Sequence, residues 1–341
     1  MGTMSDIVIA GIGQTPVGEH WDTSLRELAF QALTQALRDS GDLRPQALFV
    51  GNMLADQLIG QAHLGALLAD FAGLTGIEAY TIEAAGASGG AAFRQAYLAV
   101  KSGLIDCAAA LGVEKMTDRR GAESDVALGT TMDGDYETVH GLTLEAQAAL
   151  LMRRYLHESG APRSAFAGFP LVAHANAVSN PNAMFRRAIR AETYERAGVV
   201  ADPLNLFDVA PWADGAAAVV LIRRDLLPDD FPHPLVRVAG GAIATDTLAL
   251  HDRGDMLAFR AARLSVERAC AQAGISPQEV DFFELYDHTS VTAALSLEAA
   301  GFAERGQGWR LAQGDTLTLK GKLPILTFGG LKARGNPGGA A

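Results

Sequence analysis

Hydrophobic residues near the N-terminus repeat first with the period of a strand and then with that of a helix. Residues 6–12 form a short β-rich run that ends in Gly11-Ile12-Gly13. Beyond Ser24, a residue that favours helix N-caps, apolar residues recur at spacings of three and four until Gly41. Residues 47–50 are then an apolar run of strand length. The pattern predicts a strand–helix–strand unit, which is typical of a parallel sheet.

The same order of elements returns late in the chain. Residues 234–239 predict a strand, residues 261–273 a helix that ends at Gly274, and residues 281–285 a further strand. An internal duplication of a βαβ half explains this repeat most simply. Every α/β protein repeats such units, however, so the spacing alone does not prove a duplication.

An insert separates the two predicted halves. Residues 116–200 are rich in Asp, Arg, Asn and Pro, apart from a helical stretch at 144–157. Long loops of this kind commonly carry substrate or subunit contacts. We therefore divide the chain into an N-terminal half, 4–232, which includes the insert, and a C-terminal half, 233–341.

The turn at 84–90 is the most informative segment of the sequence. Its small residues follow a predicted strand end at 80–83 and precede a predicted helix at 91–101. Small residues allow close approach of the backbone, and a helix N-terminus directs free N–H groups at whatever lies there. A nucleophile on such a turn would have a lowered pKa, so the turn is a candidate site.

The turn Glu83-Ala84-Ala85-Gly86-Ala87-Ser88-Gly89-Gly90 resembles the active-site turn of the thiolase superfamily, where a cysteine occupies the position of Gly86. The resemblance is strongest to the archaeal and sterol-carrier-protein types. It implies a duplicated βαβαβαββ unit in a five-layer α/β/α/β/α fold. Because that duplication places a helix and two strands after Gly339, we expect either a shortened C-terminal half, which we favour, or a partner that covers the surface they would cover. Further matches follow in family order at 112–116, 174–177, 180–181, 202–204, 214–218, 244–247, 251–253 and 329–337, and together they cover nearly the whole chain.

The residues that perform the family's chemistry are replaced at three positions. The resemblance implies acyl transfer to or from coenzyme A by a cysteine thiolate, with one histidine as its activator and a second in an oxyanion hole. Gly86 stands at the cysteine position. Tyr286 replaces the histidine of a His-Asp motif, and Asn336 replaces the histidine of a Gly-His-Pro motif. These replacements predict a protein that performs neither thiolysis nor Claisen condensation.

The polar residues that remain suit binding better than turnover. Tyr286 and Asn336 are hydrogen-bond donors without acid–base power near neutral pH. His288 follows at a predicted strand end, where it is either a structural histidine or an acid–base group. The predicted substrate-binding residues are Gly86, His174, Tyr286, His288, Gly330 and Asn336.

Two other motifs give alternatives. Gly86-Ala87-Ser88-Gly89-Gly90 fits the nucleophile elbow Gly-x-Ser-x-Gly, in which Ser88 would attack with His288 or His251 as base and Asp246 behind it. In the thiolase interpretation, Ser88 is an ordinary part of the turn. Gly11-Ile12-Gly13 begins like a dinucleotide fingerprint, but the third glycine is misplaced, and we interpret it as a turn after a strand.

Composition limits the classes of partner and site. The 28 basic and 39 acidic residues give a net charge of −11, which argues against nucleic acid or an anionic membrane as the main partner. No apolar run approaches the roughly 18 residues that span a bilayer. Two cysteines exclude a disulfide framework and a multi-cysteine zinc site, so we expect no metal and a reducing cytoplasm. We expect Cys107 in a buried strand and Cys270 on a buried helix face.

The sequence therefore predicts a thiolase homologue without thiolase catalysis that binds coenzyme A or acyl-CoA, or serves as a structural subunit beside an active thiolase. The alternative is a divergent acyltransferase or thioester hydrolase that uses Ser88 or His288. The resemblance implies a homodimer and a small zinc-ribbon/OB-fold partner protein. Arg119 and Arg120, with Arg186, Arg187 and Arg190, are clusters that either meet coenzyme A phosphates or form a solvated surface.

Overall fold

The computed structural model describes residues 6–340 and divides them between two compact units. The first unit is made of the chain up to Ser124, the segment Trp212–Ala239 and the residues from Pro337 on. The second contains Asp125–Pro211 and Gly240–Asn336. These units cut across the predicted halves, because most of the insert belongs with residues of the C-terminal half. The division at 232/233 stays a prediction about the repeat.

A six-stranded mixed sheet forms the centre of the first unit, in the order β3-β2-β4-β7-β1-β8. Strand β2 is parallel to β3 and β4, while β7 is antiparallel to β4 and β1. The two strands of the predicted strand–helix–strand unit, β1 and β2, therefore lie in one sheet but do not pair with each other. The bounds are β1 Ile7–Gln14, β2 Ala47–Gly51, β3 Glu78–Ile82, β4 Cys107–Glu114, β7 Gly215–Arg223 and β8 Val236–Arg237.

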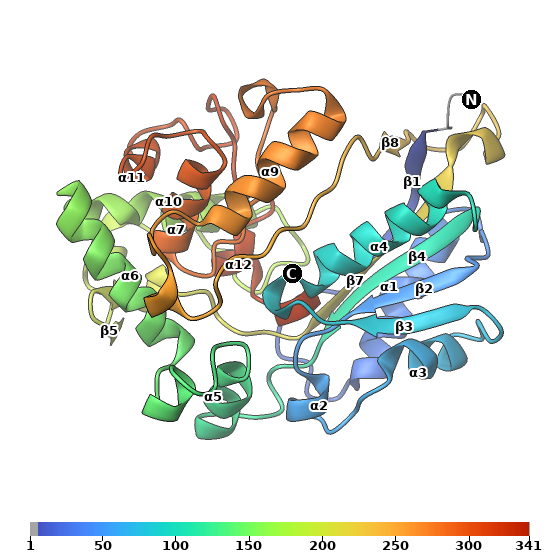
Figure 1. Cartoon of the computed structure of the whole chain (residues 1–341), viewed down its shortest axis with the longest axis horizontal. Coiled ribbons are helices and arrows are strands. Elements are labelled where there is room, and N and C mark those ends of the chain that lie inside the picture. The colour runs from blue at the N-terminus through green and yellow to red at the C-terminus, as the bar shows by residue number, and fades with distance from the viewer. Residues whose placement is uncertain (1–5, 341) are drawn as a thin grey trace. The chain divides into compact units, whose positions relative to one another are not determined.

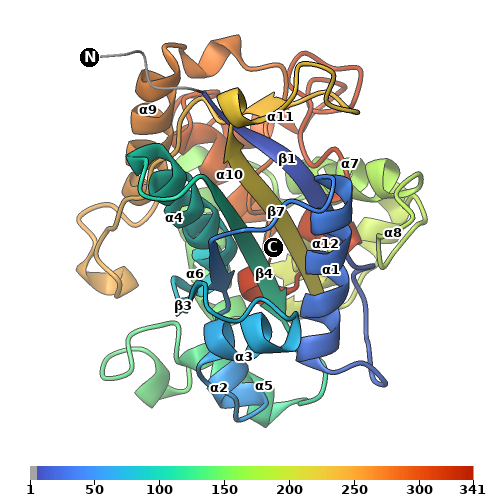
Figure 2. The same cartoon turned by 90° about the vertical axis from the view of Figure 1, so that its right-hand side faces the viewer.

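Helices cover both faces of this sheet, with α1 (Leu25–Asp39) on one face and α4 (Ser88–Ser102) on the other (Figures 1 and 2). Residues alternate between the faces because successive side chains of a strand point in opposite directions. In β2, Leu48 and Val50 join the core under α1, and Phe49 joins the core under α4. Two shorter helices, α2 (Ala55–Leu58) and α3 (Leu64–Phe71), follow β2.

Gly11 and Gly13 lie inside β1 rather than at a nucleotide-binding turn. A Cβ on Gly11 would be 2.2 Å from the carbonyl oxygen of Ala36, and one on Gly13 would be 2.1 Å from that of Ala32. Both glycines therefore let α1 pack against the strand. Ser24 begins α1 with the expected cap, a capping box in which its side chain and that of Glu27 exchange hydrogen bonds.

The second unit is mainly helical and has its own core. Tyr155, Phe166 and Phe169 are fully buried in this core beside Trp309. Its elements are α5 Ala122–Gly129, which begins in the first unit, α6 Leu144–Ser159, α7 Gly168–Ala177, α8 Ala191–Glu195, β5 Val199–Ala201, β6 Leu204–Asn205, α9 Arg260–Ala273, α10 Ser290–Ala299, α11 Gly308–Leu311 and α12 Gly330–Arg334.

Two predicted strands and one core residue differ from expectation. Residues 281–285 make one isolated parallel bridge, between Phe283 and Ile325, and the predicted strand at 234–239 is reduced to the two residues of β8. A strand needs a partner along its length, and the hydrophobic run alone does not supply one. The expectation of a buried face at Cys270 is wrong, because the described α9 has no buried residue. Cys107 is buried in β4 as expected.

Candidate functional site

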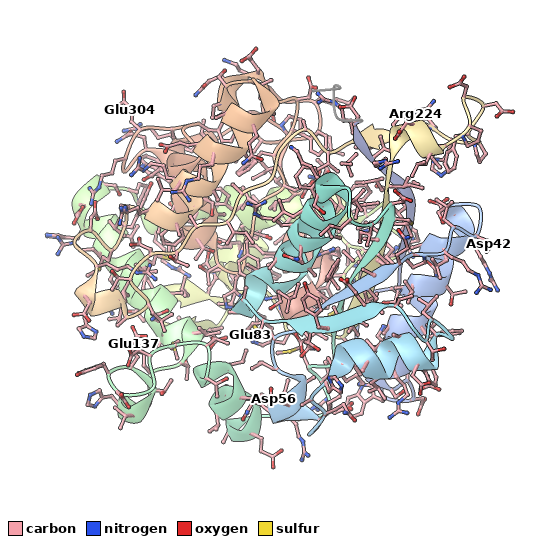
Figure 3. All side chains as sticks on the ribbon, turned by 45° about the vertical axis from the view of Figure 1, so that its right-hand side comes forward. Asp42, Asp56, Glu83, Glu137, Arg224 and Glu304 are labelled. Carbon is pink, nitrogen blue, oxygen red and sulfur yellow. The ribbon has the colours of Figure 1, made fainter. Side chains whose placement is uncertain are left out.

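The predicted turn at Gly86 lies between β3 and α4, in the first unit. Residues Ala85–Ala87 form one 3₁₀ turn, and Ala85 has a φ of +47°, a conformation that side chains rarely adopt. The carboxylate of Glu83, labelled in Figure 3, accepts a hydrogen bond of 2.6 Å from the backbone N–H of Ala85. Strained residues of this kind concentrate at functional sites.

The hydroxyl of Ser88 is used inside this turn. Ser88 is fully buried, its Oγ accepts a hydrogen bond of 2.9 Å from the N–H of Ala84, and its O–H donates to the carbonyl oxygen of Ala85 at 2.6 Å. A nucleophile elbow instead exposes its serine hydroxyl to the substrate. The geometry favours a turn-stabilising role for Ser88 over a nucleophilic one.

The buried carboxylate of Glu114 forms a hydrogen bond with Gly339, near the end of the described chain. Glu114, at the end of β4, accepts hydrogen bonds from the N–H groups of Met53, Leu54 and Gly339 and from the side-chain amide of Asn52. Burial raises the pKa of Glu114 to about 7, although these four donors favour the ionised form. Sequence analysis missed this role, even though Glu114 lies in a motif matched to the family.

Tyr286, His288 and Asn336 come together in the second unit, as the resemblance implied. The amide nitrogen of Asn336 lies 3.2 Å from Nδ1 of His288 and 3.5 Å from the hydroxyl oxygen of Tyr286. The rings of Tyr286 and His288 stack with centroids 6.2 Å apart. Asn336 is fully buried and His288 nearly so, whereas 40% of Tyr286 is exposed. The cluster therefore has one member that a ligand can reach directly.

The cluster favours hydrogen bonding over proton transfer. Burial, together with the positive charge of Lys332, lowers the pKa of His288 to about 4. His288 is therefore neutral near pH 7. Burial raises the pKa of Tyr286, so its phenol keeps its proton. Both groups can donate a hydrogen bond, and neither is poised as a base at neutral pH.

Asp287 and Lys332 are two functional-site candidates that sequence reasoning missed. The Asp287 carboxylate accepts a hydrogen bond of 2.6 Å from the N–H of Leu331, and the Lys332 ammonium donates one of 2.6 Å to the carbonyl oxygen of Asp208. Gly330 has no room for a side chain, because a Cβ would be 2.7 Å from the Asp287 carboxylate. Asp287 and Lys332 both lie in motifs already matched to the family, and this was the signal available.

The ring of His174 forms its hydrogen bond outside this cluster. It lies in α7, its ring stacks on Phe185, and its Nδ1 is 3.2 Å from the carbonyl oxygen of Arg187. Burial lowers the pKa of His174, so it too is neutral near pH 7. The structure explains it as a packed histidine of the second unit.

A cavity of about 760 Å³ lies within the second unit. Glu137, labelled in Figure 3, supports its wall because its carboxylate accepts hydrogen bonds from the N–H of Leu250 and the amide of Gln147. Apolar lining with few polar groups is typical of a small-molecule site. Sequence analysis did not find the cavity. Its lining residues are Tyr136, Glu137, His140, Gly141, Leu142, Ala146, Leu150, Leu250, His251 and Met256.

Family models match most of the chain. The model described as "Thiolase, N-terminal domain" matches residues 7–225, and "Thiolase C-terminal domain-like" matches residues 242–341. The chain belongs to the thiolase family. An acetyl-CoA acetyltransferase of Methanothermobacter thermautotrophicus is 39% identical across 99% of this chain and 88% of its own length.

Two further proteins similar to this thiolase homologue are named for a different type of reaction. The 17-hydroxy-3-oxo-4-pregnene-20-carboxyl-CoA lyase of Mycobacterium tuberculosis is 27% identical across 94% of this chain and 85% of its own length. A solved structure, the Ltp2-ChsH2(DUF35) aldolase, superposes with a TM-score of 0.83 over 97% of this chain and 86% of its own, at 24% identity. That likeness shows that the fold is the thiolase fold.

The thiolase homologue has no thiol at the Gly86 turn within residues 6–340. Cys107 is packed in β4, where burial raises the pKa of its thiol to about 12, and Cys270 lies on α9 of the second unit. Across the same residues, no group of three histidine, cysteine or acidic side chains is placed to hold a metal ion. None of the described helices is both long and apolar enough to cross a membrane.

Proposed function

We propose that this thiolase homologue binds a coenzyme A thioester but does not transfer the acyl group through a covalent enzyme intermediate. The observation that carries this proposal is Gly86, which leaves the turn without a nucleophile. Covalent acyl transfer requires an activated nucleophile and a base within reach of it. The buried thiol of Cys107 and the turn-bound hydroxyl of Ser88 supply neither.

The remaining polar groups support binding of a thioester carbonyl. Tyr286, His288 and Asn336 are neutral hydrogen-bond donors, and a carbonyl oxygen accepts from such groups. The cavity beside Leu142 and Leu250 offers an apolar space for the acyl or pantetheine portion. Exposed Arg186, Arg187 and Arg190 are suited to the phosphates.

Calorimetric titration of the purified protein with acetyl-CoA and longer acyl-CoA thioesters tests binding. We expect saturable binding, and a Tyr286→Phe, Asn336→Leu double variant should bind at least tenfold more weakly because both donors are lost. His63→Gln, an exposed change in the first unit, serves as the matched control and should leave the affinity unchanged. Failure to bind any acyl-CoA at millimolar concentrations would leave only a purely structural subunit.

A second candidate function is aldol cleavage of a β-hydroxyacyl thioester. The lyase relative favours it, since aldol cleavage needs no enzyme nucleophile. The hydroxyl proton leaves to a base, the carbon–carbon bond breaks to give a ketone or aldehyde, and its electron pair forms a thioester enolate that is then protonated. Hydrogen-bond donors such as Tyr286 and Asn336 stabilise that enolate. Incubation with β-hydroxyacyl-CoA thioesters and detection of the released carbonyl compound decide this.

We also propose a homodimer with a further protein partner, in the cytoplasm. The edge strand β3 is largely exposed along Glu78–Ile82, and such an edge can pair with another strand. The solved Ltp2-ChsH2(DUF35) aldolase supports a partner protein. Both free cysteines suit a reducing compartment. Sedimentation of the purified chain should give twice 35.8 kDa, and a stable monomer would contradict the dimer.

A further inference from the structure

A buried lysine in the second unit is not used by the binding site described above. Lys332 is only 2% exposed, and its ammonium donates a hydrogen bond of 2.6 Å to the backbone carbonyl of Asp208. Within residues 6–340, no carboxylate forms an ion pair with it at 4 Å or less. A buried ammonium without a contact ion pair is costly to the fold. This cost calls for a role that the backbone bond alone does not explain.

The segment Asp208–Ala210 forms hydrogen bonds with both Lys332 and His288. Asp208 accepts from Lys332, and two residues later the N–H of Ala210 donates to the carbonyl oxygen of His288 at 2.8 Å. Between them, Val209 forms an antiparallel bridge with Thr289. From the other side, the Asp287 carboxylate accepts from the N–H groups of Leu331 and Lys332. The ammonium and the imidazole are thereby fixed in one hydrogen-bonded frame.

The ring of His288 is oriented by Asn336. The side-chain nitrogen of Asn336 can only donate, and it lies 3.2 Å from Nδ1 of His288. Nδ1 must then accept, so it carries no proton, and the proton of a neutral ring is on Nε2. An imidazolium would place an N–H opposite an N–H and lose this hydrogen bond. With the Asn336 amide in this orientation, the geometry favours the neutral ring that carries its proton on Nε2.

We propose that Lys332 is a positioning residue of the candidate site: its buried ammonium holds His288 as a neutral imidazole, with Nδ1 accepting from Asn336 and Nε2 bearing the proton. The proposal rests on the proposed function for its purpose, since a neutral ring with its proton on Nε2 can donate a hydrogen bond from Nε2 to a thioester carbonyl while Nδ1 stays bonded to Asn336. It replaces the general-base role for His288 that the hydrolase alternative required.

Charged and titratable groups from several segments surround His288. Asp287 is adjacent in sequence and Asp208 lies on the neighbouring loop, but burial and Lys332 are the causes that lower the pKa of His288. Tyr286 keeps its proton, and Arg334 on α12 is a second buried cation near Asp287. Burial lowers the pKa of Lys332 to about 8, against the effect of Asp287 and Asp208, so the ammonium remains mostly charged at neutral pH. Its charge adds to burial in lowering the pKa of His288.

The test is long-range proton–nitrogen NMR of the full chain labelled with ¹⁵N-histidine, recorded from pH 4 to pH 8. His288→Gln identifies the signals by removing them. We expect wild-type His288 to be neutral, with its proton on Nε2, throughout pH 5.5–8. Lys332→Met should raise the proton affinity of His288 at least tenfold, and Lys332→Arg should restore the wild-type value. The signals of His63, which lies in the first unit, are the internal control.

A wild-type proton on Nδ1, or a Lys332→Met variant in which His288 titrates unchanged, would overturn the proposal. If Lys332→Met does not fold, Asn336→Asp replaces the donor with an anion, and the proposal then requires the proton to move to Nδ1 and the proton affinity to rise. Acyl-CoA titration of the same samples separates the two claims. Loss of binding with the tautomer intact contradicts the proposed function, and retained binding with the wrong tautomer contradicts this inference.

Discussion

At the scale of residues, we expect that no single replacement at Gly86, Tyr286 or Asn336 restores the chemistry of a thiolase. Each family residue acts only with the others, because a thiolate needs its base and an enolate needs its oxyanion hole. Catalytic groups that act as a unit are strongly non-additive when changed one at a time. The φ angle of Gly86 is not positive, so a residue with a side chain can adopt the same backbone conformation at this position.

The first prediction concerns restored activity. Gly86→Cys alone should give no thiolysis above background, whereas the triple variant Gly86→Cys, Tyr286→His, Asn336→His should exceed background at least tenfold. The measurement is loss of acetoacetyl-CoA in the presence of free coenzyme A. The triple variant with Gly86→Ser in place of cysteine is the matched control. Full activity from Gly86→Cys alone would show that the histidine replacements do not matter.

A second prediction concerns Glu114 and pH. Its folded pKa of about 7 lies above the ordinary value of 4.5, so the folded state binds a proton more tightly than the unfolded state. This contribution to stability is present below pH 4.5 and is lost as pH rises through 7. The loss corresponds to about 3 kcal/mol. In urea unfolding, the stability difference between wild type and Glu114→Gln should therefore shift against wild type by roughly that amount from pH 4.5 to pH 8.

For His288, the lowered pKa predicts the opposite dependence of folding stability on pH. Its folded pKa of about 4 lies below the ordinary 6.5, so the unfolded state binds the proton more tightly. The associated stability is present above pH 6.5 and is lost as pH falls through 4. Wild type should lose stability relative to His288→Gln over this acidic range, again by about 3 kcal/mol. A flat difference between the two curves would mean that the pKa of His288 is the same in the folded and unfolded states, which would contradict the lowered pKa.

At the scale of elements, the packing of α1 on β1 depends on backbone contact. The carbonyl oxygens of Ala32 and Ala36 occupy the space that a side chain at Gly13 or Gly11 would take. The prediction is that Gly13→Ala costs about 1–3 kcal/mol of folding free energy through overpacking. Gly18→Ala, which has no atom within 4 Å of the added carbon, should change stability by less than about 0.5 kcal/mol. Equal effects in thermal unfolding would contradict this account.

Elements that are set by local sequence could be predicted, and those that need a distant partner could not. The cap at Ser24, the helix that follows it and the buried strand β2 follow from periodicity and hydrogen-bonding chemistry within a few residues. Residues 281–285 have an equally apolar pattern but contact a single bridge partner, Ile325. The motif spacing placed Tyr286 beside Asn336, because the family resemblance carries tertiary information that hydrophobic patterns lack.

Some site features remained hidden because their partners are remote and carry no motif. The cavity joins the segment around His140 to that around Leu250, and Glu137 reaches Leu250 across 113 positions of sequence. The clamp on Glu114 joins it to Gly339 across 225 positions. No local pattern marks such a pair, since each residue alone resembles an ordinary loop or strand residue. The family match located these segments without assigning their contacts.

At the scale of the whole molecule, the chain has the fold of the thiolase family, and we propose that it lacks the family's catalysis. Two compact units form around their own cores, and both contain residues of the family motifs. The thiolase family models match 7–225 and 242–341, so the scaffold is established. The prediction that Gly86, Tyr286 and Asn336 replace the family's catalytic residues comes from the motifs of the sequence. Binding without covalent acyl transfer is the behaviour that this combination predicts.

The most direct test is a thiolysis measurement at saturating acetoacetyl-CoA, with binding verified in the same sample. The account predicts that the purified wild-type protein binds the thioester and leaves it unconverted when free coenzyme A is added. Turnover at the 1–10³ per second typical of enzymes would contradict it, because that rate requires a nucleophile that the turn at Gly86 does not provide.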